Sequence, residues 1–372
     1  LIVTSIQKMS RVNNREIGNR AMDLALIQGK HIVFIVDECH RSTFGDMLIA
    51  IKETFPRALF FGFTGTPIKN ENQKNMNTTQ TVFGEPLPQY LRADGIRDKN
   101  VLGFEPKLVE TYKQRDLREA VALEQAKAKT VEEAMADEKK KAIYLKYTQG
   151  KTVPMSGYHV VDGSYVKGIE DFVPESQYHC DKHHIAVVSD IKDGWNTLSQ
   201  CGKFHAILAT RSIPEAIEYY RLFREMMPEL NVTALFDPTI DNVEGAIYKE
   251  EGLVEILEGY KEMFGLDFTI PTHAQFKVDV SLRLAHKEPY NRIECEPKQQ
   301  INILIVVNQM LTGFDSKWIN TLYIDKMMEY ENIIQAFSRT NRLFGPDKPF
   351  GIIRYYRRPH TMKRNIDKAV EV

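Results

Sequence analysis

Two adjacent carboxylates follow an apolar run near the start of the sequence. Asp37 and Glu38 open the segment DECH (37–40), directly after the apolar residues 31–36. A buried strand at 31–36 places this pair at a strand's carboxyl end, where open α/β sheets bind ligands. There Asp37 can hold Mg²⁺ on a nucleotide, through water, and Glu38 can polarise the water that attacks the γ-phosphate. The alternative is an acidic turn that caps the next helix, and the preceding strand favours the catalytic interpretation.

Two hydroxyl-bearing turns follow other apolar runs. FTGTP (63–67) ends the run 58–63, and TGFD (312–315) comes just after the run 301–307. Glycine permits a tight turn at both places, and each segment alone indicates no more than a turn. What matters is position, because FTGTP stands about one strand–helix–strand unit after the acidic pair.

Two arginines near the end of the chain can meet a phosphate. We expect a helix over residues 333–340, on which Gln335, Arg339 and Arg342 lie at i, i+4 and i+7 and share one face. Two fixed guanidinium groups suit a phosphate that gains charge during transfer, an arrangement worth about 10³–10⁵ in rate. The alternative is a solvated basic helix end, and the other three motifs favour the catalytic interpretation.

These motifs need strands and helices to position them. Alternating strands and helices predict the α/β class, with doubly wound sheets. Residues 116–148 are charged and free of Gly and Pro, so they predict a long solvated helix or a helical pair. We therefore expect a first lobe over 1–115, a helical insertion and linker over 116–184, and a second lobe over 185–372. The predicted strands are 1–5, 31–36, 58–63, 206–209, 231–236, 301–307, 321–324 and 351–355, and the predicted helices are 19–28, 44–54, 214–226, 253–264, 272–285 and 333–340.

Bulk composition limits the function classes. The 372 residues have a formal net charge of −1, so any nucleic-acid site must be a local patch. The four cysteines show no CxxC spacing, which argues against a disulfide framework and favours the cytoplasm. No apolar run reaches the ~20 residues that cross a bilayer, and we predict no membrane contact. The apolar start at Leu1 leads us to expect a piece of a longer protein.

VDECH, FTGTP, TGFD and QAFSRTNR, in this order, resemble motifs II, III, V and VI of superfamily 2 helicases. VTSIQKMS, VFGEPLPQY, FHAILATRSIPEAIEYY and GIIRYYRRPHTMKRNI narrow the resemblance to the motor subunit of type I restriction endonucleases. The resemblance implies two RecA-like lobes with parallel sheets, the first truncated at its N-terminus. It implies a motor that uses ATP and Mg²⁺ to pull double-stranded DNA past itself, a nuclease domain outside this chain, and methylation and specificity subunits as partners.

The same resemblance implies roles for individual residues. His40 and Gln335 would couple the lobes, and Thr64 and Thr66 would link the ATP state to the grip on DNA. The residues that it places at the nucleotide are Asp37, Glu38, Gly313, Asp315, Arg339 and Arg342. The residues that it places at the DNA backbone are Thr4, Gln7, Thr210, Arg211 and Thr312.

No G-x-x-x-x-G-K-[ST] phosphate loop stands in the sequence. Gly150-Lys151-Thr152 is not one, because Leu145 stands where glycine is needed and Pro154 follows. We expect the phosphate loop upstream of Leu1, and we expect the 372 residues alone to hydrolyse ATP poorly.

Two other sequence patterns suggest a zinc site and a nuclease motif, and two other functions are alternatives to the restriction motor. His179, Cys180, His183 and His184 lack a second ligand cluster, so a polar loop is favoured over zinc. The Glu-Pro-Lys at 296–298 mimics a nuclease motif, but its proline argues against a core strand. The alternative functions are another superfamily 2 DNA or RNA helicase or remodeller, and a piece that only binds DNA or a partner.

Overall fold

A computed structural model gives the fold of the chain. The chain divides into two compact units, Leu1–Leu91 and Arg92–Val372, which are described separately. The structure describes residues 2–12, 19–37, 39, 44–63, 83, 87, 92–150, 152–161, 163–237, 246–307, 310–311 and 314–371.

The first unit carries a two-stranded parallel sheet, in which β1 pairs with β2 and Val33 lies opposite Leu59. The rings of Phe34 and Phe60 stack at 4.8 Å and pack against the buried side chain of Ile51. Among the residues described in this unit, side chains cover only one face of these strands. The elements are α1 (Ile6–Met9), α2 (Asn19–Gln28), β1 (Val33–Val36), α3 (Phe44–Thr54) and β2 (Leu59–Gly62).

The predicted strand at residues 1–5 is wrong for the residues that the structure describes. Residues 2–5 belong to no strand, and the side chains of Ile2 and Val3 are both 89% exposed. An apolar run becomes a strand only where a neighbouring strand satisfies its backbone, and none pairs with these residues.

The second unit is built on a six-stranded sheet in the order β3-β10-β9-β6-β8-β7, with every pair parallel. Every residue of β6, β7, β8 and β9 is buried, as expected for parallel strands covered on both faces. The strands are β3 (Phe104–Leu108), β6 (His205–Thr210), β7 (Val232–Leu235), β8 (Ile303–Val306), β9 (Ile319–Asp325) and β10 (Gly351–Tyr355).

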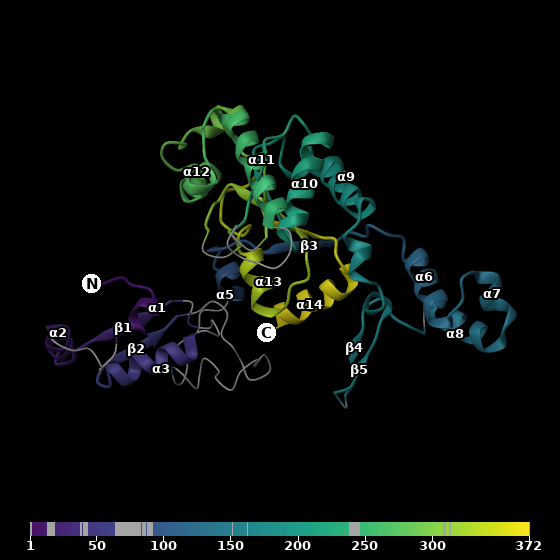
Figure 1. Cartoon of the computed structure of the whole chain (residues 1–372), viewed down its shortest axis with the longest axis horizontal. Helices are drawn as coiled ribbons and strands as arrows, with labels where there is room; N and C mark the ends of the chain where they lie inside the picture. Colours follow the sequence, from purple (N-terminus) through teal and green to yellow (C-terminus); the bar gives the residue numbers. More distant parts are fainter. Residues whose placement is uncertain are drawn as a thin grey trace. The chain divides into compact units, whose positions relative to one another are not determined.

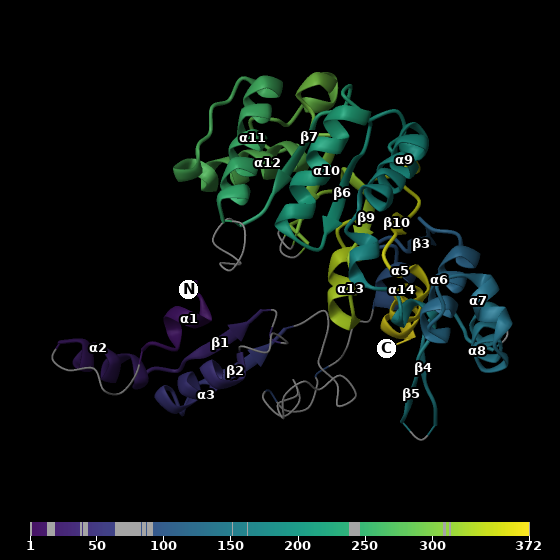
Figure 2. The same cartoon turned by 45° about the vertical axis from the view of Figure 1, so that its right-hand side comes forward.

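Helices surround this sheet. The helix α10 packs between α9 and α11, and α13 packs against α14 (Figures 1 and 2). No helix in the described residues is long and apolar enough to cross a membrane. The helices are α5 (Arg92–Arg97), α9 (Asp181–Leu198), α10 (Ile213–Met226), α11 (Ala246–Phe264), α12 (His273–Ala285), α13 (Tyr330–Phe337) and α14 (Pro359–Glu371).

The strand β3 is not among the strands that the sequence predicts, and its unit differs from the expected one. Residues up to 115 were expected in the first lobe, but Phe104 pairs with Gly351 at one edge of the second unit's sheet. Pro106 cannot donate a ladder hydrogen bond and hides the strand pattern, yet an edge strand tolerates it.

An insertion separates β3 from α9. The predicted helical stretch contains three helices, α6 (Gln114–Ala126), α7 (Val131–Ala136) and α8 (Glu138–Thr148). The side chain of Asp137 starts α8 by accepting hydrogen bonds from two backbone N–H groups at 2.9 Å. The hairpin of β4 (Tyr158–His159) and β5 (Tyr165–Val166) projects from the unit in both views (Figures 1 and 2) and is followed by the 3₁₀ turns η2 (Ile169–Asp171) and η3 (Glu175–Tyr178).

Candidate functional site

In the first unit, backbone hydrogen bonds join the ends of β1 and β2. The N–H of Phe63 donates to the carbonyl of Val36 at 2.8 Å, and the N–H of Cys39 donates to the carbonyl of Phe63 at 3.0 Å. The segments DECH and FTGTP therefore begin side by side at the carboxyl ends of two parallel strands. Asp37 is exposed there, so its carboxylate can meet a ligand.

Gly62 makes this close approach possible. A Cβ atom at this position would lie 2.8 Å from the Sγ of Cys39 and 2.9 Å from the ring of Phe83. Both distances are shorter than real Cβ contacts, so a larger residue would push the acidic segment away from β2. Glu38, His40, Thr64 and Thr66 lie outside the described residues.

In the second unit, the helix α13 ends earlier than the sequence predicts. The hydroxyl of Ser338 donates to the carbonyls of Ile334 at 2.9 Å and Gln335 at 2.8 Å, and the hydroxyl of Thr340 donates to Phe337 at 2.9 Å. Hydroxyls bonded in this way compete with the helical backbone ladder. The expectation that Gln335, Arg339 and Arg342 share one helical face is therefore wrong.

The two arginines converge by another route. The Nε of Arg342 lies 2.6 Å from Oδ1 of Asp315, and Nη1 of Arg339 donates to the carbonyl of Phe314. Arg339 also donates from Nε to the carbonyl of Gln335 at 3.2 Å. The end of the TGFD segment and the arginine segment thus form one cluster, while Thr312 and Gly313 lie outside the described residues.

The Arg342–Asp315 pair is open to solvent, with side-chain exposures of 43% and 61%. Exposed ion pairs contribute about 0–1 kcal/mol, because water screens them and two side chains lose freedom. An incoming phosphate can therefore replace Asp315 at Arg342 at little cost.

A buried polar cluster lies at the carboxyl ends of the second sheet. Asp325 ends β9 and is fully buried. Its carboxylate meets Nε2 of His183 at 2.9 Å, the hydroxyl of Tyr219 at 2.8 Å and the guanidinium of Arg357 at 3.2 Å. Burial alone would raise the pKa of Asp325, but the hydrogen bond from His183 and the charge of Arg357 outweigh it and hold that pKa well below its usual value.

This cluster corrects the prediction for the histidine-rich segment. His183 and His184 are buried in the first turns of α9 and do not form a polar loop. No group of three or more metal-ligating side chains was found among the residues that the structure describes. The histidines serve packing and the polar cluster. Asp325 follows an apolar run just as Asp37 does, which is the signal that sequence reasoning passed over.

The predicted DNA contacts differ in accessibility. Thr210 is fully buried, and its hydroxyl donates to the carbonyls of Ser212 and Val306 at 3.3 Å. This contradicts its predicted role, because the hydroxyl is directed at backbone carbonyls at the end of the sheet and not at solvent. Arg211 is 48% exposed, and Thr4 and Gln7 are exposed in the first unit.

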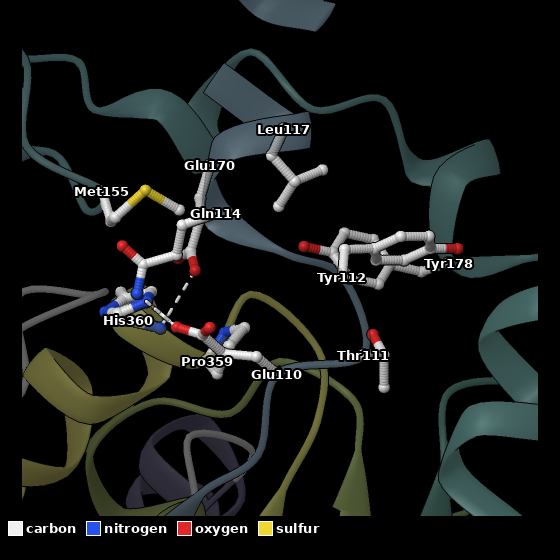
Figure 3. A pocket seen from close by; sticks show the side chains of 10 residues that line it. All are labelled: Glu110, Thr111, Tyr112, Gln114, Leu117, Met155, Glu170, Tyr178, Pro359 and His360. Atoms are coloured by element: carbon white, nitrogen blue, oxygen red, sulfur yellow. Dashed lines mark hydrogen bonds and ion pairs between the residues drawn. The ribbon is translucent and has the colours of Figure 1, made fainter. Parts of the chain in front are cut away.

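A small pocket lies where the insertion meets α14 (Figure 3). Glu170 is 1% exposed and accepts hydrogen bonds from the N–H of His360 at 3.0 Å, the N–H of Thr361 at 2.7 Å and the Thr361 hydroxyl at 2.6 Å. Burial raises the pKa of Glu170 in spite of these bonds. Figure 3 also shows His360 facing Glu110, whose carboxylate lies 2.8 Å from Nε2. These contacts fasten the insertion to the start of α14, and nothing in them calls for a ligand.

Comparisons with known proteins identify two segments. Residues 1–142 match the SWI2/SNF2 ATPase family model, and residues 202–358 match the model of type I restriction enzyme subunit R domain 3. A type I restriction enzyme endonuclease subunit of Staphylococcus aureus (strain COL) is 32% identical over 386 residues, covering 100% of this chain and 35% of the relative. The HindI endonuclease subunit of Haemophilus influenzae is 25% identical, covering 86% of this chain and 26% of the relative.

Among solved structures, the ATP-dependent Type ISP restriction-modification enzyme LlaBIII bound to DNA aligns with 94% of this chain and 19% of its own, at 14% identity and a TM-score of 0.46. The chain spans about a third of the length of the staphylococcal relative.

Proposed function

This chain is homologous over its whole length to the endonuclease (R) subunits of type I restriction enzymes, and from this premise we propose that it forms the larger part of an ATP-driven motor for double-stranded DNA. ATP hydrolysis would drive translocation, and cleavage would follow in a nuclease domain outside these 372 residues. Duplex DNA and the methylation and specificity subunits would be its partners, in the cytoplasm.

The observation that carries the proposal is the match of residues 1–142 to the SWI2/SNF2 ATPases, a segment that contains DECH at the end of β1. Exposed Asp37 suits Mg²⁺ held through water, and Mg²⁺ when bound would neutralise charge on the phosphates. Glu38 would accept a proton from the attacking water, which adds to the γ-phosphate as ADP leaves.

The cluster around Arg342 in the second unit supports the roles that we propose for the two arginines. Arg339 and Arg342 would stabilise the charge that develops on the γ-phosphate, with Arg342 leaving Asp315 to do so. Gly313 and Asp315 would lie at the nucleotide. His40 and Gln335 would couple the lobes, Thr64 and Thr66 would link the ATP state to DNA, and the remaining DNA contacts would be Thr4, Gln7, Arg211 and Thr312.

Two alternatives stay open. Another superfamily 2 helicase or remodeller would also match the SWI2/SNF2 model, but the match of residues 202–358 to the restriction-subunit domain favours the restriction motor. A chain that only binds DNA or a partner is the third possibility. The 372 residues contain no G-x-x-x-x-G-K-[ST] segment, so we propose that by themselves they hydrolyse ATP slowly.

The test is ATP hydrolysis by the parent subunit with and without linear duplex DNA, beside its Glu38→Gln variant. We expect duplex to raise the rate and the variant to lower it at least about 10²-fold, because the variant lacks the proton acceptor. Glu53→Gln, an exposed site on α3 in the same unit, is the matched control and should keep the wild-type rate. A rate that ignores duplex would indicate another polymer, and one that survives Glu38→Gln would remove Glu38 from the chemistry.

A further inference from the structure

One carboxylate in the second unit is shared by three guanidinium groups. Oε2 of Glu175 lies 2.5 Å from Nη1 of Arg211, and Oε1 lies 2.9 Å from Nη2 of Arg358. Oε2 is also 3.7 Å from Nη1 of Arg357. Glu175 stands on η3, whereas the arginines directly follow β6 and closely follow β10, so the contact unites segments far apart in the sequence.

The three arginines differ in their other partners. Arg357 is 1% exposed and already paired with Glu215 at 2.9 Å and Asp325 at 3.2 Å. Among the described residues, Arg211 and Arg358 each form an ion pair with Glu175 and with no other carboxylate. Two guanidinium groups therefore share the carboxylate of Glu175, whereas Arg357 contacts two further carboxylates, so three arginines face three carboxylates at this locus.

Arg358 is held in an unusual conformation. Its φ is 42°, in the left-handed region that residues with a side chain seldom occupy. Its Nη2 also donates to the carbonyl of Val173 at 3.0 Å, while its buried Nε has no hydrogen-bond partner among the described residues. The two contacts of Nη2, with Glu175 and with Val173, hold this guanidinium beside the carboxylate.

We propose that Arg211 and Arg358 form a binding site for a backbone phosphate of duplex DNA, and that Glu175 occupies this site when DNA is absent. The inference rests on the proposed function, since it assumes that the chain binds duplex DNA. A carboxylate and a phosphate both offer paired oxygens to guanidinium donors, so one can replace the other. Glu175 is 41% exposed and Arg211 is 48% exposed, so the phosphate can enter from solvent and the carboxylate can turn out into it.

The first test is Glu175→Gln in the parent subunit, measured by fluorescence anisotropy of a labelled linear duplex without ATP, at 50 to 200 mM NaCl. Removing the competing carboxylate frees two guanidinium groups, so the Kd for duplex should fall about 3–10-fold. The slope of log K against log salt should steepen by about one phosphate equivalent, because one more counterion is released. Tighter binding is an outcome that misfolding cannot produce.

The matched variants make the result specific. Arg358→Gln should weaken duplex binding and cancel the gain when combined with Glu175→Gln. Glu124→Gln, which removes an exposed carboxylate from α6, should leave the affinity unchanged. If Glu175→Gln leaves duplex affinity unchanged or weakens it, while thermal unfolding stays like wild type, Glu175 merely positions Arg211 and the proposal is overturned.

Two further arms separate this inference from the proposed function. If duplex stimulates ATP hydrolysis by the wild-type subunit but Glu175→Gln does not bind duplex more tightly, only the inference fails. If the wild-type subunit neither binds duplex nor responds to it, the proposed function and the inference fail together. If Glu175→Gln tightens binding of ATP and not of duplex, the site takes a nucleotide phosphate, and the assignment to DNA is overturned.

Discussion

Two aspartates stand at the ends of parallel strands in this chain, and their surroundings are opposite. Asp37 follows β1 in the first unit and is exposed. Asp325 ends β9 in the second unit, is fully buried, and is bonded to His183, Tyr219 and Arg357. Strand-end position is therefore a weak guide to function, because burial and partners decide whether a carboxylate can leave its contacts and take a ligand.

The sheets that carry them differ in the same way. Ile35 of β1 and Leu59 of β2 are 70% and 60% exposed, whereas every residue of β9 is buried. The first unit offers an accessible carboxylate on a thinly covered sheet. The second unit holds its aspartate inside a packed core, where a charge survives only because it is paired.

The largest expected effect separates the two aspartates by stability. Asp325→Asn removes the charge that pairs with buried Arg357 and His183, so it should lower the free energy of unfolding by about 3–5 kcal/mol. Asp37→Asn, at an exposed site, should lower it by clearly less than Asp325→Asn does. Urea denaturation of the two variants measures both. Equal losses of unfolding free energy in the two variants would show that the difference in burial between the two aspartates does not affect stability.

A smaller effect is the loss of stability at low pH, which tests how the buried second unit depends on a neutral histidine. Burial lowers the pKa of His184 to about 4, below its usual value near 6.5. Between these two pH values, the imidazole is protonated in the unfolded chain and neutral in the folded chain. The stability from neutral His184 is present above pH 6.5 and is lost progressively as the pH falls from 6.5 towards 4. At pH 5 the loss relative to pH 7 should be about 2 kcal/mol for this residue.

The measurement is urea denaturation of wild type and His184→Gln at pH 7 and pH 5. The variant should lose less stability between the two pH values, because glutamine does not titrate. Burial also lowers the pKa of His205, to about 3, so part of the loss should remain in the variant. An identical loss in both proteins would contradict the predicted role of His184.

The smallest effect concerns the open face of the first sheet. Ile35→Ser, at a side chain that is 70% exposed, should change the unfolding free energy of the 372-residue chain by less than about 0.5 kcal/mol. Ile305→Val, in buried β8, should cost about 0.5–1.5 kcal/mol. A larger cost of Ile35→Ser in the parent subunit than in this chain would show that a further segment covers that face.

Hydrophobic patterning predicted most of the fold. The helices at 19–28 and 44–54 have the predicted bounds, and the α/β class with parallel strands is confirmed. Pattern alone failed where pairing or polar side chains decide. Residues 2–5 have no partner strand, Pro106 hides β3, and the hydroxyl of Ser338 ends α13 before Arg339.

The same distinction holds for the candidate site, where sequence motifs indicated some residues and only the fold shows the others. Motif order drew attention to Asp315 and Arg342, and these two residues form an ion pair in the structure. It gave no hint of Glu175, because its partners Arg211 and Arg358 are distant in sequence and only the fold brings them together. Ion pairs of this kind depend on chain topology, and no local sequence pattern predicts them.

The neighbours β3 and β10 have a consequence for the order of folding. Phe104 pairs with Gly351, so the first strand of this unit stays without its partner until roughly 250 further residues have been synthesised. Contacts of such long range slow folding, whereas α6 and α8 of the insertion contact each other locally and can form early. A ribosome-bound chain that stops before residue 351 should therefore expose β3 to protease while the insertion resists it.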